Sequence, residues 1–284
     1  MSPKISRPKW QKNLYSNESY PDNYTDESFL RDLKRNVNLK HYTYFEALCG
    51  ATFLTNQLSC ITSFLLNFYF LYTEEVSPSS ALVFNGLITI VCYVLYKWRN
   101  MSLKDLVESS KTILTVLIFG FIFSPLMHTL TDAISTDTIY SMTFFMMFLN
   151  VAFHDYGLKS ALVSKPISLN AAIFASICLA SRLSSPYHAF ALLVISAVYF
   201  VLYPIFSKMF WKPYFLIPIV LGCCFCLKMV SLPVLYTYIC IVVFINVACP
   251  WAFVKLQCHK DNIYGPWDEA VVHSDIGLEK KKRL

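Results

Sequence analysis

Five ionisable residues flank one apolar stretch and are the strongest candidates for chemistry. His128, Asp132 and Asp137 precede this stretch, and His154 and Asp155 close it. A His–Asp pair can exchange protons in general acid–base catalysis. An ionisable side chain at membrane depth is costly, so a functional role is the first hypothesis. One interpretation is a membrane-embedded lipid-modifying enzyme that uses these pairs.

The same region also has a structural interpretation. Thr136 can cap a helix that begins there, and Asp137 then lies favourably against the positive end of the helix dipole. At the far end, Gly157 can terminate the helix, or the turn before it can contact a headgroup or a partner. Arg182 either snorkels to the outer surface or pairs with an acid such as Asp132 or Asp137.

No other reaction centre is recognisable. The sequence has neither an Asp-x-Asp metal site nor a glycine-rich phosphate loop, and only 7 of its 284 residues are glycine. Most of the 10 cysteines fall inside apolar runs, where Cys behaves as a small hydrophobic residue. We therefore expect no catalytic residue, metal or cofactor in this chain, and a scaffolding or lipid-handling role.

Long apolar runs must position all of these residues. A helix needs roughly 20 apolar residues to cross a bilayer core, and about 17 to 25 are tolerated. About eight runs approach this length: 46–72, 80–97, 112–130, 138–154, 167–183, 187–206, 213–230 and 232–254. With 56% hydrophobic and 15% charged residues, the composition excludes an ordinary soluble domain.

Basic residues occupy alternate gaps between these runs. All 24 Lys and Arg residues except Arg182 and Lys228 lie in the N-terminal segment, in every second gap, or in the C-terminal segment. By the positive-inside rule, these regions face the cytosol. We therefore predict an all-α polytopic transmembrane helical bundle with about eight spans and both termini cytosolic.

The pattern divides the chain into three regions. They are a cytosolic N-terminal arm at 1–45, a transmembrane bundle at 46–254 and a cytosolic C-terminal tail at 255–284. Within the arm, residues 26–37 separate apolar and basic side chains onto two faces at helical spacing. This spacing predicts a basic amphipathic helix that lies in the headgroup layer or docks against a partner subunit.

Small residues form a stripe on the fifth expected span. Ala172, Ser176 and Ala180 recur every four residues. Such a stripe lets two helices approach closely in lipid. It can pack inside this chain's own bundle or against another membrane subunit.

Short motifs spread along most of the chain resemble one known family. In order they are Trp10–Lys12 with Tyr15, Pro21–Tyr24, Ser135–Tyr140, Asp155–Gly157, Ser168–Asn170, Ala172–Ser176, Cys178–Leu183, His188–Phe190, Cys249–Pro250, Asn262–Ile263 and Gly265–Ala270. Their order and spacing are similar to the PIG-C family, whose members are subunits of phosphatidylinositol N-acetylglucosaminyltransferase. The first, second and seventh spans depart most from that pattern.

The resemblance implies a subunit of the endoplasmic reticulum membrane complex that begins GPI-anchor biosynthesis. That complex transfers N-acetylglucosamine from UDP-GlcNAc to phosphatidylinositol, and its sugar-nucleotide chemistry is attributed to a different subunit. The implied partners are the catalytic glycosyltransferase subunit, other membrane subunits and phosphatidylinositol, with no nucleic acid. The expected partner or lipid contacts are Trp10, Tyr15, Asp22, Asn23, Tyr24, Asp137, Asp155, Asn170, Arg182, His188, Asn262, Trp267, Asp268 and Glu269.

Two alternatives stay open beside this scaffold hypothesis. One is the membrane-embedded enzyme that uses the His and Asp pairs. The other is a lipid transporter or scramblase, which would need helices broken at matching positions of two halves. The prolines of this chain show no such symmetry.

Overall fold

The computed structural model describes most of the chain between residues 41 and 261. Its described residues are 20–21, 23–24, 34–36, 39, 41–97, 117–118, 120–122, 124–126, 129, 134–156, 164–210, 216–261 and 263–264. The chain divides into two compact units, one made of residues 43–254 and the other of residues 1–42 together with 255–284.

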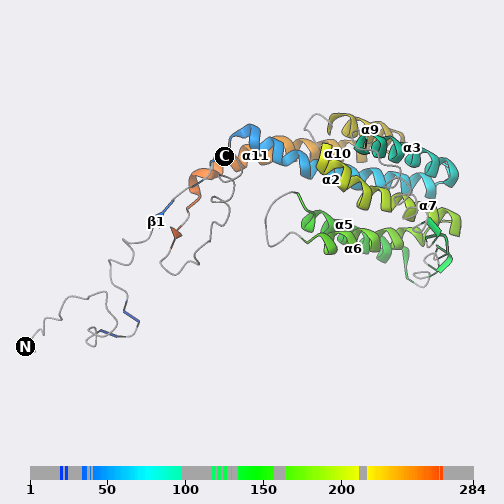
Figure 1. Ribbon diagram of the computed structural model, residues 1–284, viewed down its shortest axis with the longest axis horizontal. Helices are drawn as coiled ribbons and strands as arrows, with labels where there is room; N and C mark the ends of the chain where they lie inside the picture. The colour runs from blue at the N-terminus through cyan, green and yellow to red at the C-terminus, as the bar shows by residue number, and fades with distance from the viewer. Residues whose placement is uncertain are drawn as a thin grey trace, which may run out of the picture. The chain divides into compact units, whose positions relative to one another are not determined.

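Helices make up nearly all of the part of the larger unit that the structure describes (Figure 1). They are α2 (Tyr44–Tyr72), α3 (Pro78–Lys97), α5 (Thr136–Phe153), α6 (Lys165–Ala180), α7 (Pro186–Ala197), η1 (Val198–Leu202), α8 (Tyr203–Phe210), α9 (Leu216–Val230), α10 (Leu232–Val243), η3 (Phe244–Ala248) and α11 (Cys249–Leu256). The π-helical turns η1 and η3 join α7 to α8 and α10 to α11 without a break. The all-α prediction is confirmed, and each expected apolar run that the structure describes coincides with a helix; the run at 112–130 lies largely outside the described residues.

Local capping chemistry explains where the helices begin. Before α2, the Thr43 hydroxyl accepts a hydrogen bond from the Glu46 N–H, and the Glu46 carboxylate accepts one from the Thr43 N–H. Before α5, the cap is Ser135, whose hydroxyl accepts from the Thr138 N–H. Our assignment of the cap to Thr136 is therefore wrong by one residue. The first side chain able to reach the free N–H groups takes the role, and Thr136 becomes the first helical residue.

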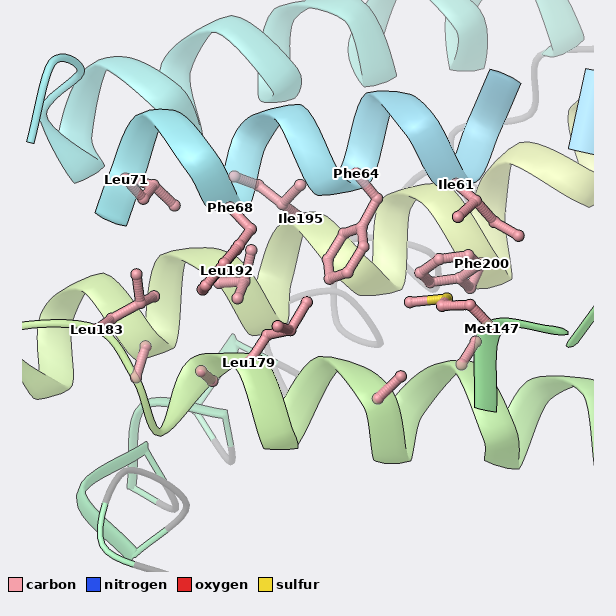
Figure 2. Close-up of a cluster of buried hydrophobic side chains, with 14 of the residues drawn as sticks. Ile61, Phe64, Phe68, Leu71, Met147, Leu179, Leu183, Leu192, Ile195 and Phe200 are labelled. Atoms are coloured by element: carbon pink, nitrogen blue, oxygen red, sulfur yellow. The ribbon is translucent and has the colours of Figure 1, made fainter. Parts of the chain in front are cut away.

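The main hydrophobic core lies where α2, α6 and α7 meet (Figure 2). The Phe64 ring of α2 meets the Phe200 ring of η1 edge-on, with ring centroids 5.2 Å apart. Leu179 of α6 and the pair Leu192 and Ile195 of α7 are fully buried beside them. Interdigitated side chains of this kind fix how the helices cross.

The small-residue stripe of α6 faces this core. Ala172, Ser176 and Ala180 are completely buried within the chain, and the Ser176 hydroxyl donates to the Ala172 carbonyl at 2.7 Å. Of the two interpretations of the stripe, packing inside the chain's own bundle is the one observed. The small side chains let α6 lie between α5 and α7 at close range.

Among the residues that the structure describes, two continuous helices are long and apolar enough to cross a membrane, Pro186–Ser207 and Leu232–His259. Shorter apolar helices cover Pro78–Val94, Lys165–Ala180 and Leu216–Val230. Only 6% of the most apolar window of Leu232–His259 is buried. A core helix of a soluble protein would be mostly buried, so this exposure favours a lipid-facing helix.

The smaller unit joins the N-terminal arm to the C-terminal tail. Strand β1 (Lys34–Arg35) pairs antiparallel with β2 (Ile263–Tyr264), with Lys34 opposite Tyr264. In η4 (Gln257–His259), the Gln257 side chain accepts from the Tyr42 N–H at 2.6 Å and donates to the Tyr42 carbonyl at 2.9 Å. The Asn36 amide also donates to Asp261 at 3.0 Å.

These contacts correct part of the expected amphipathic helix at 26–37. Lys34 and Arg35 lie in a strand, and the rest of that helix falls outside the described residues apart from Asn36. Asn36 has a positive φ of 54°, which ends any helical repeat there. The backbone of this segment pairs instead with a tail segment far away in sequence, which local periodicity cannot reveal.

Candidate functional site

Half of the expected contact residues lie outside the described part of the chain. They are Trp10, Tyr15, Asp22, Asn262, Trp267, Asp268 and Glu269, and His128 and Asp132 join them. In the described part of the arm, the Tyr24 N–H donates to the Pro21 carbonyl at 2.9 Å, which forms a turn. Tyr24 and Asn23 are both exposed, and the Tyr24 ring lies 4.4 Å from the Tyr20 ring.

Asp137 and Arg182 lie at the same end of the bundle, each near Tyr140. Asp137 is exposed in the first turn of α5, as expected from the dipole argument. Arg182 follows α6 and, like Asp137, lies close enough to influence the Tyr140 hydroxyl, which is near Tyr72, the last residue of α2. Polar groups at the end of α2, at the start of α5 and just after α6 therefore lie near one another at this end.

His188 has a structural partner in its own helix. Its Nδ1 lies 2.7 Å from the hydroxyl of Ser185, the residue that caps α7. Asn170, by contrast, is exposed on α6. Of the residues expected on α6 and α7, Asn170 is therefore the one whose polar group faces outward.

The opposite end of α5 forms a compact corner with α6. Helix α5 ends at Phe153 with His154 as its C-cap residue, so our placement of the cap at Gly157 is wrong. The backbone turns extended at His154, which ends the helix before glycine is needed. Asp155 then forms an ion pair with Lys165 of α6 at 3.2 Å.

Tyr156 completes this corner. Its hydroxyl donates to the Val151 carbonyl at 2.8 Å, and its ring lies 5.1 Å from that of His154. Burial raises the pKa of Tyr156 well above its usual range, which keeps the hydroxyl a neutral donor. The ionisable residues at the two ends of α5 are therefore engaged in separate local structures.

The main polar cluster in the interior lies on α2 and was missed from the sequence. We call it the α2 polar stripe: Thr55, Asn56, Gln57, Ser59, Ser63 and Asn67. Gln57 donates to Asn150 of α5 at 2.7 Å, and Asn150 donates to the carbonyl and hydroxyl of Ser168 of α6 at 2.9 and 3.0 Å. One buried chain of hydrogen bonds thus spans three helices.

Three more members of the stripe form hydrogen bonds to α10, α9 and α3. Ser59 bonds Tyr238 of α10 at 2.8 Å, and Ser63 bonds Cys223 of α9 at 3.2 Å. Asn67 accepts from Asn85 of α3 at 2.9 Å. Helix α2 is therefore hydrogen-bonded to each of these neighbours in the described bundle.

Both π-helical turns face the α2 polar stripe. At η1, Tyr199 accepts a bond from Asn67 at 3.4 Å, and one turn later Tyr203 donates to Asn56. At η3, Asn246 donates to Thr55 at 2.7 Å. A π turn rotates the following residues around the helix axis, and here it coincides with polar contacts to α2.

A sequence signal for this stripe existed. Asn56, Gln57 and Asn67 are amides inside an apolar run of spanning length, where an amide must find a partner on another helix. Among the described residues, no group of three His, Cys, Asp or Glu residues could hold a metal ion. The geometry is that of a packing hub built from neutral groups.

Comparison with known proteins identifies the family. A family model described as "GPI2: Phosphatidylinositol N-acetylglucosaminyltransferase" matches residues 10–268. The human PIG-C protein, which is named as a subunit of phosphatidylinositol N-acetylglucosaminyltransferase, is 33% identical over 280 residues, which cover 94% of each chain. The chain belongs to this family. Two yeast relatives are named as the GPI2 subunit. The one from Schizosaccharomyces pombe is 26% identical, over 92% of this chain and 86% of the relative. The one from Saccharomyces cerevisiae is 24% identical, over 89% of this chain and 85% of the relative.

The match to the PIG-C family covers nearly all of the expected contact residues. It begins at Trp10 and ends at Asp268, so only Glu269 lies beyond it. No solved structure matches this chain. The chain is thus a helical membrane protein of the PIG-C family.

Proposed function

We propose that this chain is the PIG-C scaffold of the complex that transfers N-acetylglucosamine from UDP-GlcNAc to phosphatidylinositol. It assembles with a catalytic glycosyltransferase subunit and other membrane subunits, and it helps to position the lipid substrate. The names of its human and yeast relatives support the complex and its reaction. UDP-GlcNAc and phosphatidylinositol are substrates of the whole complex.

The hydrogen bonds of the α2 polar stripe support the scaffolding part of this proposal. The buried polar side chains that the structure describes are Ser, Thr, Asn and Gln, which form hydrogen bonds and do not titrate near neutral pH. Those of the stripe bond α2 to its neighbours. An interior organised in this way suits a rigid frame for other subunits.

The pairing of arm and tail supports a common side for the two termini. Strand β1 precedes α2 and β2 follows α11, so a ladder between them supports both ends on one face of the membrane. Hydrogen-bonded strands cannot meet across a bilayer. Together with the distribution of Lys and Arg, this favours an even number of spans and cytosolic termini in the endoplasmic reticulum membrane.

A transfer assay tests the proposed function. The chain is purified alone and as part of its detergent-extracted complex, and each sample receives radiolabelled UDP-GlcNAc and phosphatidylinositol vesicles. We expect labelled glycolipid only from the complex. We also expect cells that lack the chain to lose GPI-anchored surface protein. Transfer by the isolated chain would refute the scaffold role.

A further inference from the structure

Two prolines occupy the same position after the two π-helical turns. Helices α7 and α10 have 12 residues each, and each is followed by a π turn of 5 residues and an α-helix of 8 residues. Pro204 is the second residue of α8, and Pro250 is the second residue of α11. Along the sequence the prolines show no symmetry between two halves. The structure reveals this match because it places both prolines directly after a π turn.

Pro204 explains why a π turn forms before it. Proline has no N–H, and in a regular α-helix its ring clashes with the carbonyl four residues earlier. For Pro204 that carbonyl belongs to Phe200. A π turn contains one more residue than an α turn, which moves the ring away from this carbonyl. In agreement, the Tyr203 N–H donates to the Val198 carbonyl, five residues earlier.

The same relation holds in the helix from α10 to α11. In a regular α-helix, the Pro250 ring would clash with the carbonyl of Asn246. Instead, the Cys249 N–H donates to the Phe244 carbonyl, five residues earlier. Sharp bends in helices occur mostly at prolines and at π turns. Both helices therefore combine the two features at one point.

The turn at η1 leaves a backbone carbonyl without a donor from its own helix. The Tyr203 N–H bonds Val198, and Pro204 has no N–H, so the helix offers no donor to the Tyr199 carbonyl. The thiol of Cys60 on α2 donates to this carbonyl at 3.3 Å. A helix that lacks backbone bonds at one turn opens there more easily than elsewhere. The turn is thus weakened within its own helix and attached to α2.

Polar contacts place both turns at one level of α2. The Tyr203 hydroxyl donates to Asn56, and Asn246 of η3 donates to Thr55 at 2.7 Å. Because Thr55 and Asn56 are adjacent, the two π turns lie beside the same helical turn of α2. Each π turn therefore has an attachment on α2 about which the following helix can tilt.

Burial differs between the two sides of this level. Before the turns, Leu192 of α7 is buried in the main core, and Tyr238 of α10 is buried in a second core with α2 and α9. Beyond them, Pro250 is the one buried residue of α11, and no residue in the described part of α8, 203–207, is buried. Helix α2 likewise has no buried residue before Thr52. The segments beyond the turns are therefore loosely held.

We propose that the two proline-linked π turns are a matched pair of hinges, at which α8 and α11 tilt while α2, α7 and α10 stay packed. In the observed state, the bond from Tyr203 to Asn56 holds α8 against α2. In the tilted state this bond is broken, and the π turns keep their other bonds to α2. The hinges let this end of the bundle change shape without disturbing the hydrophobic cores. The inference concerns the chain itself, so it stands or falls independently of the proposed function.

Fluorine NMR in lipid nanodiscs tests the hinge of α8 with a matched control. Trifluoromethyl-phenylalanine replaces Ile205 in one variant and Val234 in another. Ile205 is 54% exposed just after η1, and Val234 is 49% exposed near the start of α10, before η3. We expect two resonances or one exchange-broadened resonance from position 205, and a single narrow resonance from position 234. A single narrow resonance from position 205 would overturn the proposal.

Substitutions at the hinge should change amide hydrogen exchange in opposite directions. Pro204→Ala supplies the missing N–H, so the amides of α8 should exchange about three- to tenfold more slowly, as expected for one added backbone hydrogen bond. Tyr203→Phe removes the bond to Asn56, so the same amides should exchange faster. Pro218→Ala is the control, because Pro218 lies in the first turn of α9, where its N–H would have no partner in the helix. Pro250→Ala should slow exchange in α11 alone.

The outcomes decide between a hinge and a rigid bend. Unfolding temperatures verify that each variant is folded, and Tyr203→Phe decides the matter if Pro204→Ala does not fold. Unchanged exchange in a folded Pro204→Ala variant would contradict the hinge at η1. Exchange in α8 that is no faster after Tyr203→Phe would contradict it as well. An equal effect of Pro218→Ala on α8 would show a general change in the bundle and would also overturn the proposal.

Discussion

Single buried amides decide how the helices of this bundle are held. Gln57 and Asn150 are both buried, and each hydrogen-bonds a different neighbour. A buried amide without a partner is unfavourable, so each pair fixes the rotation of its helices. The stripe therefore contributes specificity in a membrane, where apolar packing alone discriminates little between alternative helix arrangements.

Gln57→Leu should destabilise the bundle because it removes the donor to the Asn150 side-chain oxygen. We expect a loss of about 1 kcal/mol, which lowers Tm by about 2–4 °C in detergent. Thr143→Val is the matched control, because the Thr143 hydroxyl is buried without a hydrogen-bond partner. That variant should be neutral or slightly more stable. Equal Tm values for the two variants would contradict the role of the stripe.

Asp137→Asn separates the structural and catalytic interpretations of the acids around α5. Asp137 is exposed in the first turn of α5, where its charge contributes about 0.3–1 kcal/mol through the helix dipole. We expect the variant to restore GPI-anchored surface protein fully in cells lacking the native chain. Asp155→Asn, which weakens the pair with Lys165, should also restore it. Complete loss with normal expression would favour the membrane-embedded enzyme.

At the scale of elements, apolar periodicity predicted the helices well and their partners poorly. The runs at 46–72 and 138–154 became α2 and α5 almost residue for residue. Bilayer thickness and backbone hydrogen bonding leave few options for an apolar run, which is why this part succeeds. The bond from Gln57 to Asn150 could not be predicted, because it joins residues 93 positions apart.

Ala175→Leu tests the close packing of α6. Ala175 is fully buried in the core beside α2 and α7, so added methyl groups have no room. We expect a loss of about 1–3 kcal/mol, measured as reduced Tm or reduced yield of folded protein. The adjacent Phe174 is 40% exposed, and Phe174→Leu should be tolerated. A stable Ala175→Leu variant would show that α6 packs more loosely than observed.

At the scale of the whole molecule, the described parts of the arm and the tail are hydrogen-bonded to each other. The β1–β2 ladder and the Gln257 clamp on Tyr42 tie the arm to the tail. A ladder of two-residue strands is marginal by itself, so the side-chain clamp matters for its persistence. We infer from this pairing that both termini lie on one side of the membrane.

Gln257→Leu should release the arm from the tail. The substitution removes both hydrogen bonds to the Tyr42 backbone, so we expect the arm to be cleaved several-fold faster by limited proteolysis. Cys258→Ser, at an exposed neighbouring position, should leave the rate unchanged. In sealed microsomes, protease should reach tags on both ends of the wild type without detergent. Protection of one tag alone would show that the termini lie on opposite sides.

The sequence by itself determined the class of the protein, its helices and its family. The length of an apolar run and the basic residues beside it are local properties of the sequence. They determine whether a segment lies in lipid or in water, so they can be recognised without the fold. Tertiary structure alone decided that α2 is the hub, that Ser135 rather than Thr136 caps α5, and that Lys34 pairs with Tyr264. Each of these depends on which side chain or backbone group the fold places within hydrogen-bonding distance. Positions far apart in the chain, or competing side by side, become distinguishable only when the fold brings them together.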